Sequence, residues 1–269
     1  MTAILLVISD VDGTLVTPDK QITKASARAA QLLYEKGIGL TVVSSRPPVG
    51  LRMLVEPLSL QLPMGAFSGG TVVSPDLAVI EQHFVPTSAA RQTADVLAAF
   101  GVDIWLYTAR GWLVRDPAGH YIANERRTIR ADPLVVSDFS THFENAFKIV
   151  GSSRDFARLA ECETAVREAL GDQAFVARSQ PYYLDITAPG RDKGTFLESL
   201  SKRLAVPPPA IAVVGDGNND LAMFRKAGMS IAMGNAGEEV KARATHSAAA
   251  NTEDGFARAI EQYVIGGAM

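Results

Sequence analysis

Cysteine is almost absent from this sequence of 269 residues: Cys162 is the only one, so no internal disulfide can form. The four histidines are dispersed and lack metal-binding spacing. There is no excess of positive charge, because 26 lysines and arginines face 29 acidic residues, for a net charge of −3. This balance argues against nucleic acid or a membrane surface as a partner.

Long apolar runs are also missing, and no stretch approaches the length of a membrane span. The N-terminus lacks the basic start and long apolar segment of a signal peptide, so we expect a cytoplasmic protein. Nothing in the sequence indicates its oligomeric state. The one basic cluster, Arg126, Arg127 and Arg130, is expected to form a solvated face. What the sequence does have is 47% hydrophobic residues over a length sufficient for two domains.

Two acidic residues follow a short apolar run near the N-terminus. Ile4 to Ile8 is typical of a strand buried on both faces of a parallel sheet, and Asp10 and Asp12 come directly after it. In open α/β sheets, ligands bind beyond the carboxyl ends of the strands. Because clustered carboxylates repel each other, a bound cation is the usual reason for them to persist.

A second apolar run, Ile211 to Val214, ends in the same way, with Asp216 and Asp220 in the following loop. Either loop alone is equally compatible with a turn and a helix N-cap, since Asp, Asn and Gly serve both purposes. Two such loops favour a functional site at which four acids meet one hard cation. Oxygen ligands without His or Cys favour Mg²⁺.

Four segments resemble, in order, the motifs of the haloacid dehalogenase superfamily. They are Asp10-Val11-Asp12-Gly13-Thr14, then Ser44 with Arg46, then Lys193 within Asp192-Lys193-Gly194, and finally Gly215-Asp216 through Asn219-Asp220. The long insert between the second and third motifs resembles the type IIB (C2) cap of Cof-like phosphatases. The resemblance covers essentially the whole chain.

The resemblance implies an α/β fold, with a Rossmann-like parallel-sheet core domain and an inserted α+β cap domain. The alternation of strand and helix signals agrees with it and changes near residue 82 to a mixed pattern. We therefore expect the core domain at residues 1–81 and 189–269. The cap domain, which sets substrate specificity in this family, is expected at residues 82–188.

The chemistry of phosphate esters suggests a role for each motif residue. Asp10, the first acid after the strand, is the expected nucleophile, and Asp12 is the expected general acid and base. Lys193 offers a compact positive charge, and Ser44 a short hydroxyl donor. Arg46 is expected to pair with the acidic cluster and is not placed in the catalytic set. Phosphate contacts are expected from Gly13, Thr14, Ser44, Lys193 and Asn219, and metal ligands from Asp10, Asp12 (by resemblance, through its backbone carbonyl), Asp216 and Asp220.

The sequence thus predicts a Mg²⁺-dependent phosphatase that acts on small phosphorylated metabolites through an aspartyl phosphate. By resemblance, Asp12 points to phosphatases and phosphomutases, because dehalogenases lack this acid and ion-pumping ATPases have Thr in its place. A phosphotransferase or phosphomutase is the alternative, followed by a non-catalytic metabolite-binding protein. Sugar phosphates and phosphorylated cofactors both agree with the resemblance. Aromatic residues of the cap, whose orientation the sequence leaves open, are candidates to contact them: Trp105, Tyr107, Trp112, Tyr182 and Tyr183.

Overall fold

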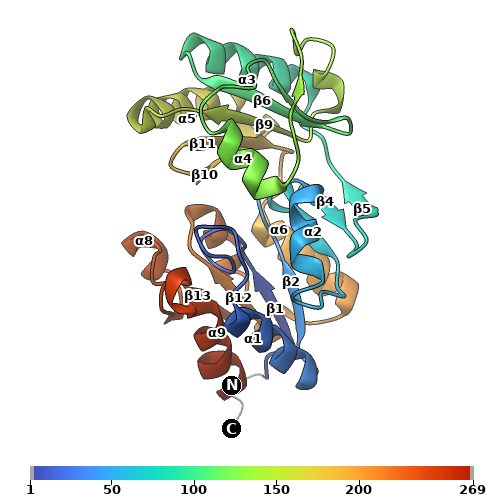
Figure 1. Ribbon diagram of the computed structural model, residues 1–269, viewed down its shortest axis with the longest axis vertical. Helices are drawn as coiled ribbons and strands as arrows, with labels where there is room; N and C mark the ends of the chain where they lie inside the picture. Colours follow the sequence, from blue (N-terminus) through green and yellow to red (C-terminus); the bar gives the residue numbers. More distant parts are fainter. Residues whose placement is uncertain (1–2, 267–269) are drawn as a thin grey trace.

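Two large β-sheets lie one above the other in the computed structural model, which describes residues 3–266 (Figure 1). The lower sheet has five parallel strands in the order β14-β13-β12-β1-β2. Both ends of the chain contribute to it: β1 (Leu6–Ser9), β2 (Gly39–Val42), β12 (Ile211–Gly215), β13 (Met229–Ala232) and β14 (His246–Ser247). The carboxyl ends of these strands point toward the upper sheet (Figure 1).

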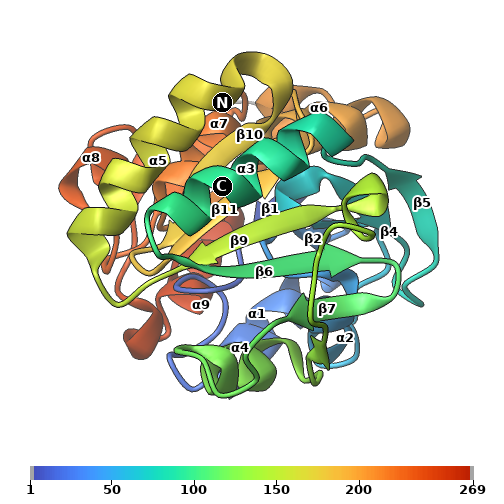
Figure 2. The same cartoon turned by 90° about the horizontal axis from the view of Figure 1, so that it is seen from above.

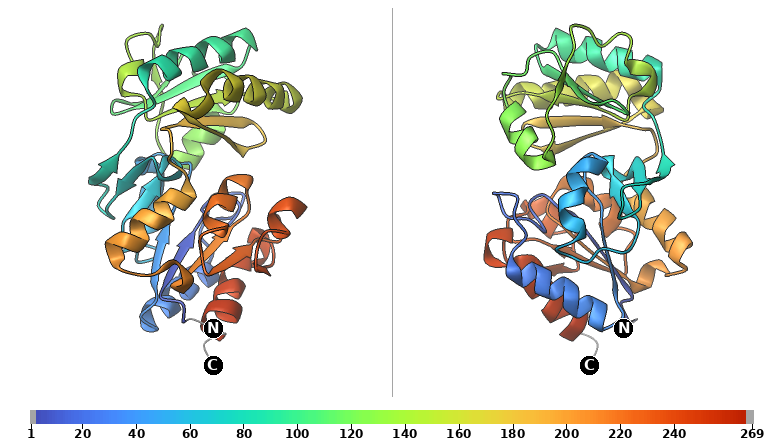
Figure 3. Two further views of the ribbon diagram at one scale, coloured as in Figure 1. Left: turned by 180° about the vertical axis from the view of Figure 1, so that it is seen from behind. Right: turned by 45° about the vertical axis from the view of Figure 1, so that its right-hand side comes forward.

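Helices cover both faces of the lower sheet. Alternate residues of β1 explain this, because Val7 belongs to one apolar cluster and Leu6 and Ile8 to another. Figure 3 shows α6 in front of the sheet in its left view and α1 in front in its right view. The helices on the Val7 side are α1 (Lys24–Glu35), α2 (Pro48–Val55) and α9 (Gly255–Ala259), and those on the other side are α6 (Lys193–Leu204), α7 (Leu221–Phe224) and α8 (Glu238–Lys241).

The upper sheet is mixed, with six strands in the order β10-β11-β9-β6-β7-β8. Its outer face is covered by α3 (Thr87–Ala99) and α5 (Phe156–Leu170), which Figure 2 shows lying across the strands. A further helix, α4 (Ile122–Ile129), lies beside it toward the lower sheet (Figure 1). The strands are β6 (Asp103–Thr108), β7 (Gly111–Val114), β8 (Leu134–Val135), β9 (Lys148–Ser152), β10 (Phe175–Gln180) and β11 (Tyr183–Thr187).

The inner face of the upper sheet is aromatic and packs toward the core domain. Tyr107 lies 5.6 Å from Phe67, between ring centroids, and Phe147 lies 5.8 Å from the same ring. One apolar cluster therefore runs from the cap into the core domain. The orientation that the sequence left open is thus inward for Trp105, Tyr107, Trp112 and Tyr183.

A third, small antiparallel sheet follows β2 of the lower sheet in the chain and precedes the first strand of the upper sheet. It consists of β3 (Met64–Ala66), β4 (Thr71–Val73) and β5 (Val79–Gln82). The pair of β4 and β5 is the hairpin that the sequence of residues 71–80 predicts. A parallel bridge from Val43 to Gly65 attaches it to the end of β2. Short 3₁₀ turns occur at Phe67–Gly69, Phe143–Asn145, Gly171–Gln173, Pro208–Ala210, Asn218–Asp220 and Asn251–Glu253.

The predicted fold class, a Rossmann-like core with an α+β cap, is confirmed by this arrangement and by the solved structures compared below. The domain boundaries at 81/82 and 188/189 stay a prediction, and residues 1–2 and 267–269 of the predicted core domain lie outside the described residues. None of the helices between residues 3 and 266 is long and apolar enough to cross a membrane.

Some elements differ from the sequence-based expectation. The sequence after the second acidic loop predicts a helix from Asp220 to Ala227, but the helix in the structure is shorter, Leu221–Phe224, and follows a 3₁₀ turn. The reason is that the Asp220 side chain accepts hydrogen bonds from the backbone ahead of it and sits before the helix instead of inside it. The sequence also predicts a last helix from Asp254 to Val264, which the structure forms as α9 and a π-helix over Ile260–Ile265, whereas α4 was not predicted.

Thr23 is the N-cap residue of α1, a helix that packs into the apolar core. Its hydroxyl accepts a hydrogen bond of 3.1 Å from the Ser26 backbone N–H at the start of α1. We predict that Thr23→Ala lowers the free energy of unfolding by about 1 kcal/mol, because that N–H loses its partner. Urea unfolding measures this, with Thr23→Ser as the matched control; an equal loss in both variants would contradict the capping role.

Candidate active site

Four parallel strands end at the same edge of the lower sheet, and a polar residue follows each one. Asp10 follows β1, Ser44 follows β2, Asp216 follows β12, and Asn235 comes shortly after β13. This edge faces the cap sheet (Figure 1). Residues far apart in the sequence are therefore brought to one place by the strand order alone.

Three carboxylates meet there around one lysine. Asp10, Asp216 and Asp220 each offer an oxygen, and these oxygens lie within 4.8 Å of one another. The Lys193 ammonium lies 2.5 Å from Asp10 Oδ1 and 2.6 Å from Asp220 Oδ1, and this lysine is 1% exposed. It opens α6, whose N-cap Asp192 forms a capping box with Thr195.

The cluster carries more negative than positive charge. Burial, together with the neighbouring carboxylates Asp10 and Asp220, raises the pKa of Asp216 to about 8. Burial likewise raises the pKa of Asp10 to about 6, although Lys193 opposes the shift. An oxygen-only donor set with unbalanced negative charge fits a hard divalent cation.

Asp220 uses both of its oxygens in contacts with the protein. Oδ1 pairs with Lys193, and Oδ2 accepts hydrogen bonds of 2.9 Å from the N–H groups of Asp216 and Gly217. These bonds fix the loop that carries Asp216.

The Gly13–Thr14 turn fits closely against Asp216. Thr14 Oγ1 donates a hydrogen bond of 3.0 Å to Asp216 Oδ1. Gly13 has a φ of +86°, and a Cβ there would lie 2.1 Å from Asp216 Oδ2, so only glycine fits. Asn235 Nδ2 donates to the Gly13 carbonyl at 2.9 Å and to Asp216 Oδ2 at 3.3 Å. Sequence reasoning missed Asn235, although its place after a parallel strand was a usable signal.

Asp12 is not part of the three-carboxylate cluster, and two cations hold its side chain. Arg46 donates to it through Nε at 2.7 Å and Nη2 at 2.8 Å, and Lys20 Nζ lies 2.6 Å from Oδ1. Burial raises its pKa, but these two cations outweigh burial and hold the pKa of Asp12 below its usual range. The expected pairing of Arg46 with the acids is present, whereas Lys20 was not foreseen.

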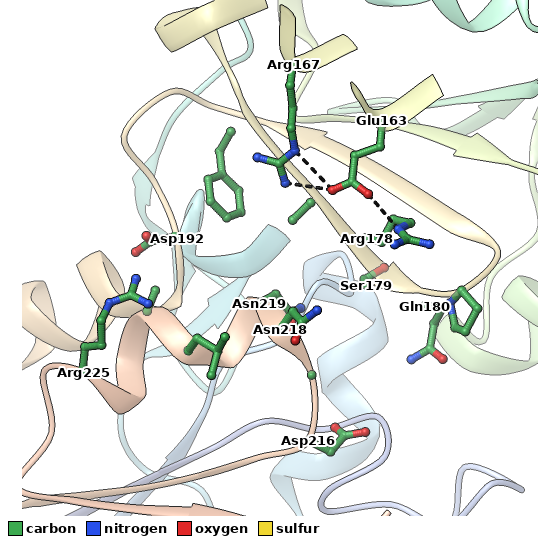
Figure 4. Close-up of a pocket in the computed structure, with 16 residues that line it drawn as sticks. Glu163, Arg167, Arg178, Ser179, Gln180, Asp192, Asp216, Asn218, Asn219 and Arg225 are labelled. Atoms are coloured by element: carbon green, nitrogen blue, oxygen red, sulfur yellow. Dashed lines mark hydrogen bonds and ion pairs between the residues drawn. The ribbon is translucent and has the colours of Figure 1, made fainter. Parts of the chain in front are cut away.

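Within residues 3–266, neither Ser44 nor Asn219 makes a hydrogen bond to the carboxylates of the cluster. Ser44 is buried, and its Oγ accepts a hydrogen bond of 3.2 Å from the Arg46 backbone. Asn219 lines a cleft of about 550 Å³ between core and cap. Figure 4 shows Asp216, Asn218 and Asn219 on its core side and Arg178, Ser179 and Gln180 on its cap side. Their roles in phosphate binding stay a prediction.

Residues 7–260 match the family model described as haloacid dehalogenase-like hydrolase. The chain belongs to this family. A putative phosphatase of Haemophilus influenzae is 26% identical over 259 residues, covering 95% of this chain and 97% of that protein. The 5-amino-6-(5-phospho-D-ribitylamino)uracil phosphatase YitU of Bacillus subtilis is 28% identical, covering 96% of this chain and 97% of that protein.

A solved structure agrees with these relatives. The crystal structure of a haloacid dehalogenase-like hydrolase from Bacteroides thetaiotaomicron is 27% identical, with a TM-score of 0.84, covering 96% of this chain and 99% of that one. The predictions of the family and of a phosphoric monoester hydrolase are therefore confirmed. The relatives have phosphorylated substrates, and the family generally uses a divalent metal.

Among residues 3–266, only the Lys193 ammonium pairs with two of these carboxylates, so removing it tests how the charge of the cluster affects stability. We predict that Lys193→Met lowers the free energy of unfolding at neutral pH by about 3–5 kcal/mol, because buried carboxylates lose their partner. Urea unfolding in EDTA measures this. Lys202→Met, at an exposed position of the same helix α6, is the control, and an equal loss there would contradict the prediction.

The raised pKa of Asp216 predicts a pH dependence of stability. Between about pH 4 and about pH 8 the folded metal-free protein binds more protons than the unfolded chain, so its stability falls as the pH rises. We expect the melting temperature in EDTA to decrease over this range, and less so with saturating Mg²⁺, which would replace the protons. Asp216→Asn should flatten the slope and Asp19→Asn, at an exposed position, should not; an unchanged slope in Asp216→Asn would exclude this origin.

Proposed function

We propose that this chain is a Mg²⁺-dependent phosphatase that hydrolyses small phosphorylated metabolites through an aspartyl phosphate on Asp10. The observation that carries the proposal is the position of Asp10. Its carboxylate is buried at the end of β1, is held by Lys193, and belongs to an acid cluster beside the cleft between core and cap. Family membership and the named phosphatase relatives support it.

Asp10 suits the role of nucleophile because Lys193 fixes one of its oxygens and leaves the other for attack. The Asp10 oxygen would form a bond to phosphorus while the ester oxygen leaves, and water would then cleave the aspartyl phosphate. Lys193 also supplies positive charge beside the incoming phosphate. The hydroxyl of Ser44 and the amide of Asn219 are donors that we assign to the phosphoryl oxygens, and the Thr14 hydroxyl would join them by turning from Asp216 to the phosphate.

The metal would be held by the side chains of Asp10 and Asp216 and by the backbone carbonyl of Asp12. Because both oxygens of Asp220 already have partners, we assign Asp220 to the loop and to contact with the metal through water. Bound Mg²⁺ would supply the charge that offsets repulsion between a carboxylate and a phosphate dianion.

Asp12 is the acid and base of this proposal, and its surroundings set a condition on that role. While Arg46 and Lys20 hold it, it is ionised, as a base that takes a proton from water must be. To protonate a leaving group it must first take up a proton itself. Substrate binding must therefore draw at least one of the two cations away from Asp12.

Phosphate release from p-nitrophenyl phosphate and a panel of phosphorylated sugars, nucleotides and cofactors tests the proposal. We predict release that needs Mg²⁺ and that falls at least about 10³-fold in Asp10→Asn, because the nucleophile is lost. Asp76→Asn, an equal substitution at a fully exposed site of the core domain, should keep full activity. With Asp12→Asn, intact mass spectrometry should detect a retained phosphoryl group on Asp10.

Other outcomes would replace the proposal. Activity that survives in Asp10→Asn would contradict it. Phosphoryl transfer to a sugar hydroxyl faster than to water would indicate the phosphotransferase alternative. Tight binding of a phosphorylated metabolite without turnover would indicate a binding protein.

A further inference from the structure

Glu125 is a buried acid of the cap that the proposed reaction does not use. It lies in α4, is 8% exposed, and accepts a hydrogen bond of 2.6 Å from the Tyr107 hydroxyl. No ion pair involves it among the residues that the structure describes. Tyr107 occupies only Oε1, so within the described part of the chain Oε2 is left to accept a hydrogen bond from a ligand.

Glu125 shares a pocket with Asp12, a residue of the proposed reaction. It lines a small pocket together with Asp12, Lys20, Arg46 and Lys148. Asp12 is the residue that we assign to protonate the leaving group, so this pocket lies on the leaving-group side of the site. Glu125 therefore faces the part of a substrate next to the ester oxygen.

The cations of this pocket already have partners. Arg46 and Lys20 pair with Asp12, and Lys148 lies 2.7 Å from Asp185 and donates a hydrogen bond of 3.0 Å to the Ser45 carbonyl. The pocket is thus not arranged to receive a second anionic group. Glu125 and Asp12 would repel one.

The size of the pocket limits what Glu125 can bind. Its volume is about 30 Å³, which is room for about one water molecule or one hydroxyl group. Ser179 and Gln180 line both this pocket and the cleft of about 550 Å³. A leaving group can therefore place one hydroxyl beside Glu125 while the rest of it occupies the larger cleft.

We propose that Glu125 binds a hydroxyl group of the leaving group next to the phosphoester, and that this contact selects phosphate esters of polyols, meaning sugars and sugar alcohols. A hydroxyl both donates and accepts, so it suits Glu125 whether the carboxyl is ionised or protonated. Tyr107 occupies Oε1 of Glu125, so a leaving group without a hydroxyl would leave the other oxygen, Oε2, without that additional hydrogen bond. This inference rests on the proposed function.

Burial raises the pKa of Glu125, while the hydrogen bond from Tyr107 opposes the shift. The carboxyl group is therefore more easily protonated than one in water. This agrees with a partner that can serve as donor or acceptor.

Matched pairs of substrates test the inference. Glycerol, erythritol and ribitol phosphates would be compared with propyl, butyl and pentyl phosphates of equal chain length, by kcat/KM for phosphate release. We expect at least one polyol ester to exceed its alkyl partner by at least about tenfold. The ratio should fall toward one in Glu125→Leu and be partly restored in Glu125→Gln, which keeps a polar group for the hydroxyl.

Controls separate this contact from a general effect of the substitution. Glu161→Leu removes an exposed cap glutamate outside the pocket and should leave the ratio unchanged. Hydrolysis of p-nitrophenyl phosphate, which has no hydroxyl on its leaving group, should fall less in Glu125→Leu than hydrolysis of the polyol esters. Melting temperatures show whether each variant folds, and Glu125→Gln keeps the test open if Glu125→Leu does not.

The outcomes are distinct from those of the proposed function. Equal rates for polyol and alkyl esters, or a ratio that Glu125→Leu leaves intact, would overturn the inference. So would an equal loss on all substrates, which indicates a structural role. In each case, Mg²⁺-dependent hydrolysis of p-nitrophenyl phosphate that disappears in Asp10→Asn would still support the phosphatase. Without that hydrolysis, both proposals fail.

Discussion

The sharing of one buried ammonium by two carboxylates is the interaction on which the site depends. Lys193, at the start of α6, joins Asp10 after β1 to Asp220 before α7. Asp220 in turn holds the loop of Asp216 through two backbone N–H groups. Because Asp216 remains without a full counter-charge, the same contacts that order the loops also prepare a place for a cation.

The core domain and the cap contribute different groups to the site. The core sheet supplies the groups assigned to phosphate and metal, and it does so with strand ends that any substrate of this family would meet in the same way. The cap supplies the inner aromatic face of its sheet, the charged residues Lys148 and Asp185 of that sheet, and Glu125 of α4. We therefore expect the cap to determine which leaving groups bind, and the core domain to determine which metal binds.

Much of the fold was predictable because it rests on local signals. The strand at Leu6–Ser9 and the helix that Thr23 caps follow from apolar patterning and a capping residue, and Asp10 and Asp216 follow from their place after strands. Helix α4 was missed because it starts at Tyr121 in the left-handed region, without a side-chain cap. Lys20, Glu125 and Lys148 were not found because their partners are distant in sequence or their burial depends on packing between the sheets.

The hydrogen bond from Lys148 to the Ser45 carbonyl joins the cap to the core domain. Ser45 stands between Ser44 and Arg46, so the loop that would hold the phosphate and restrain Asp12 is fastened to the cap by its own backbone. Any separation of the sheets wide enough to break this bond also brings the buried pair of Lys148 and Asp185 nearer to water. Lys148 therefore adds a polar contact to the aromatic packing of Phe67 against Tyr107 and Phe147 in holding the cap to the core domain.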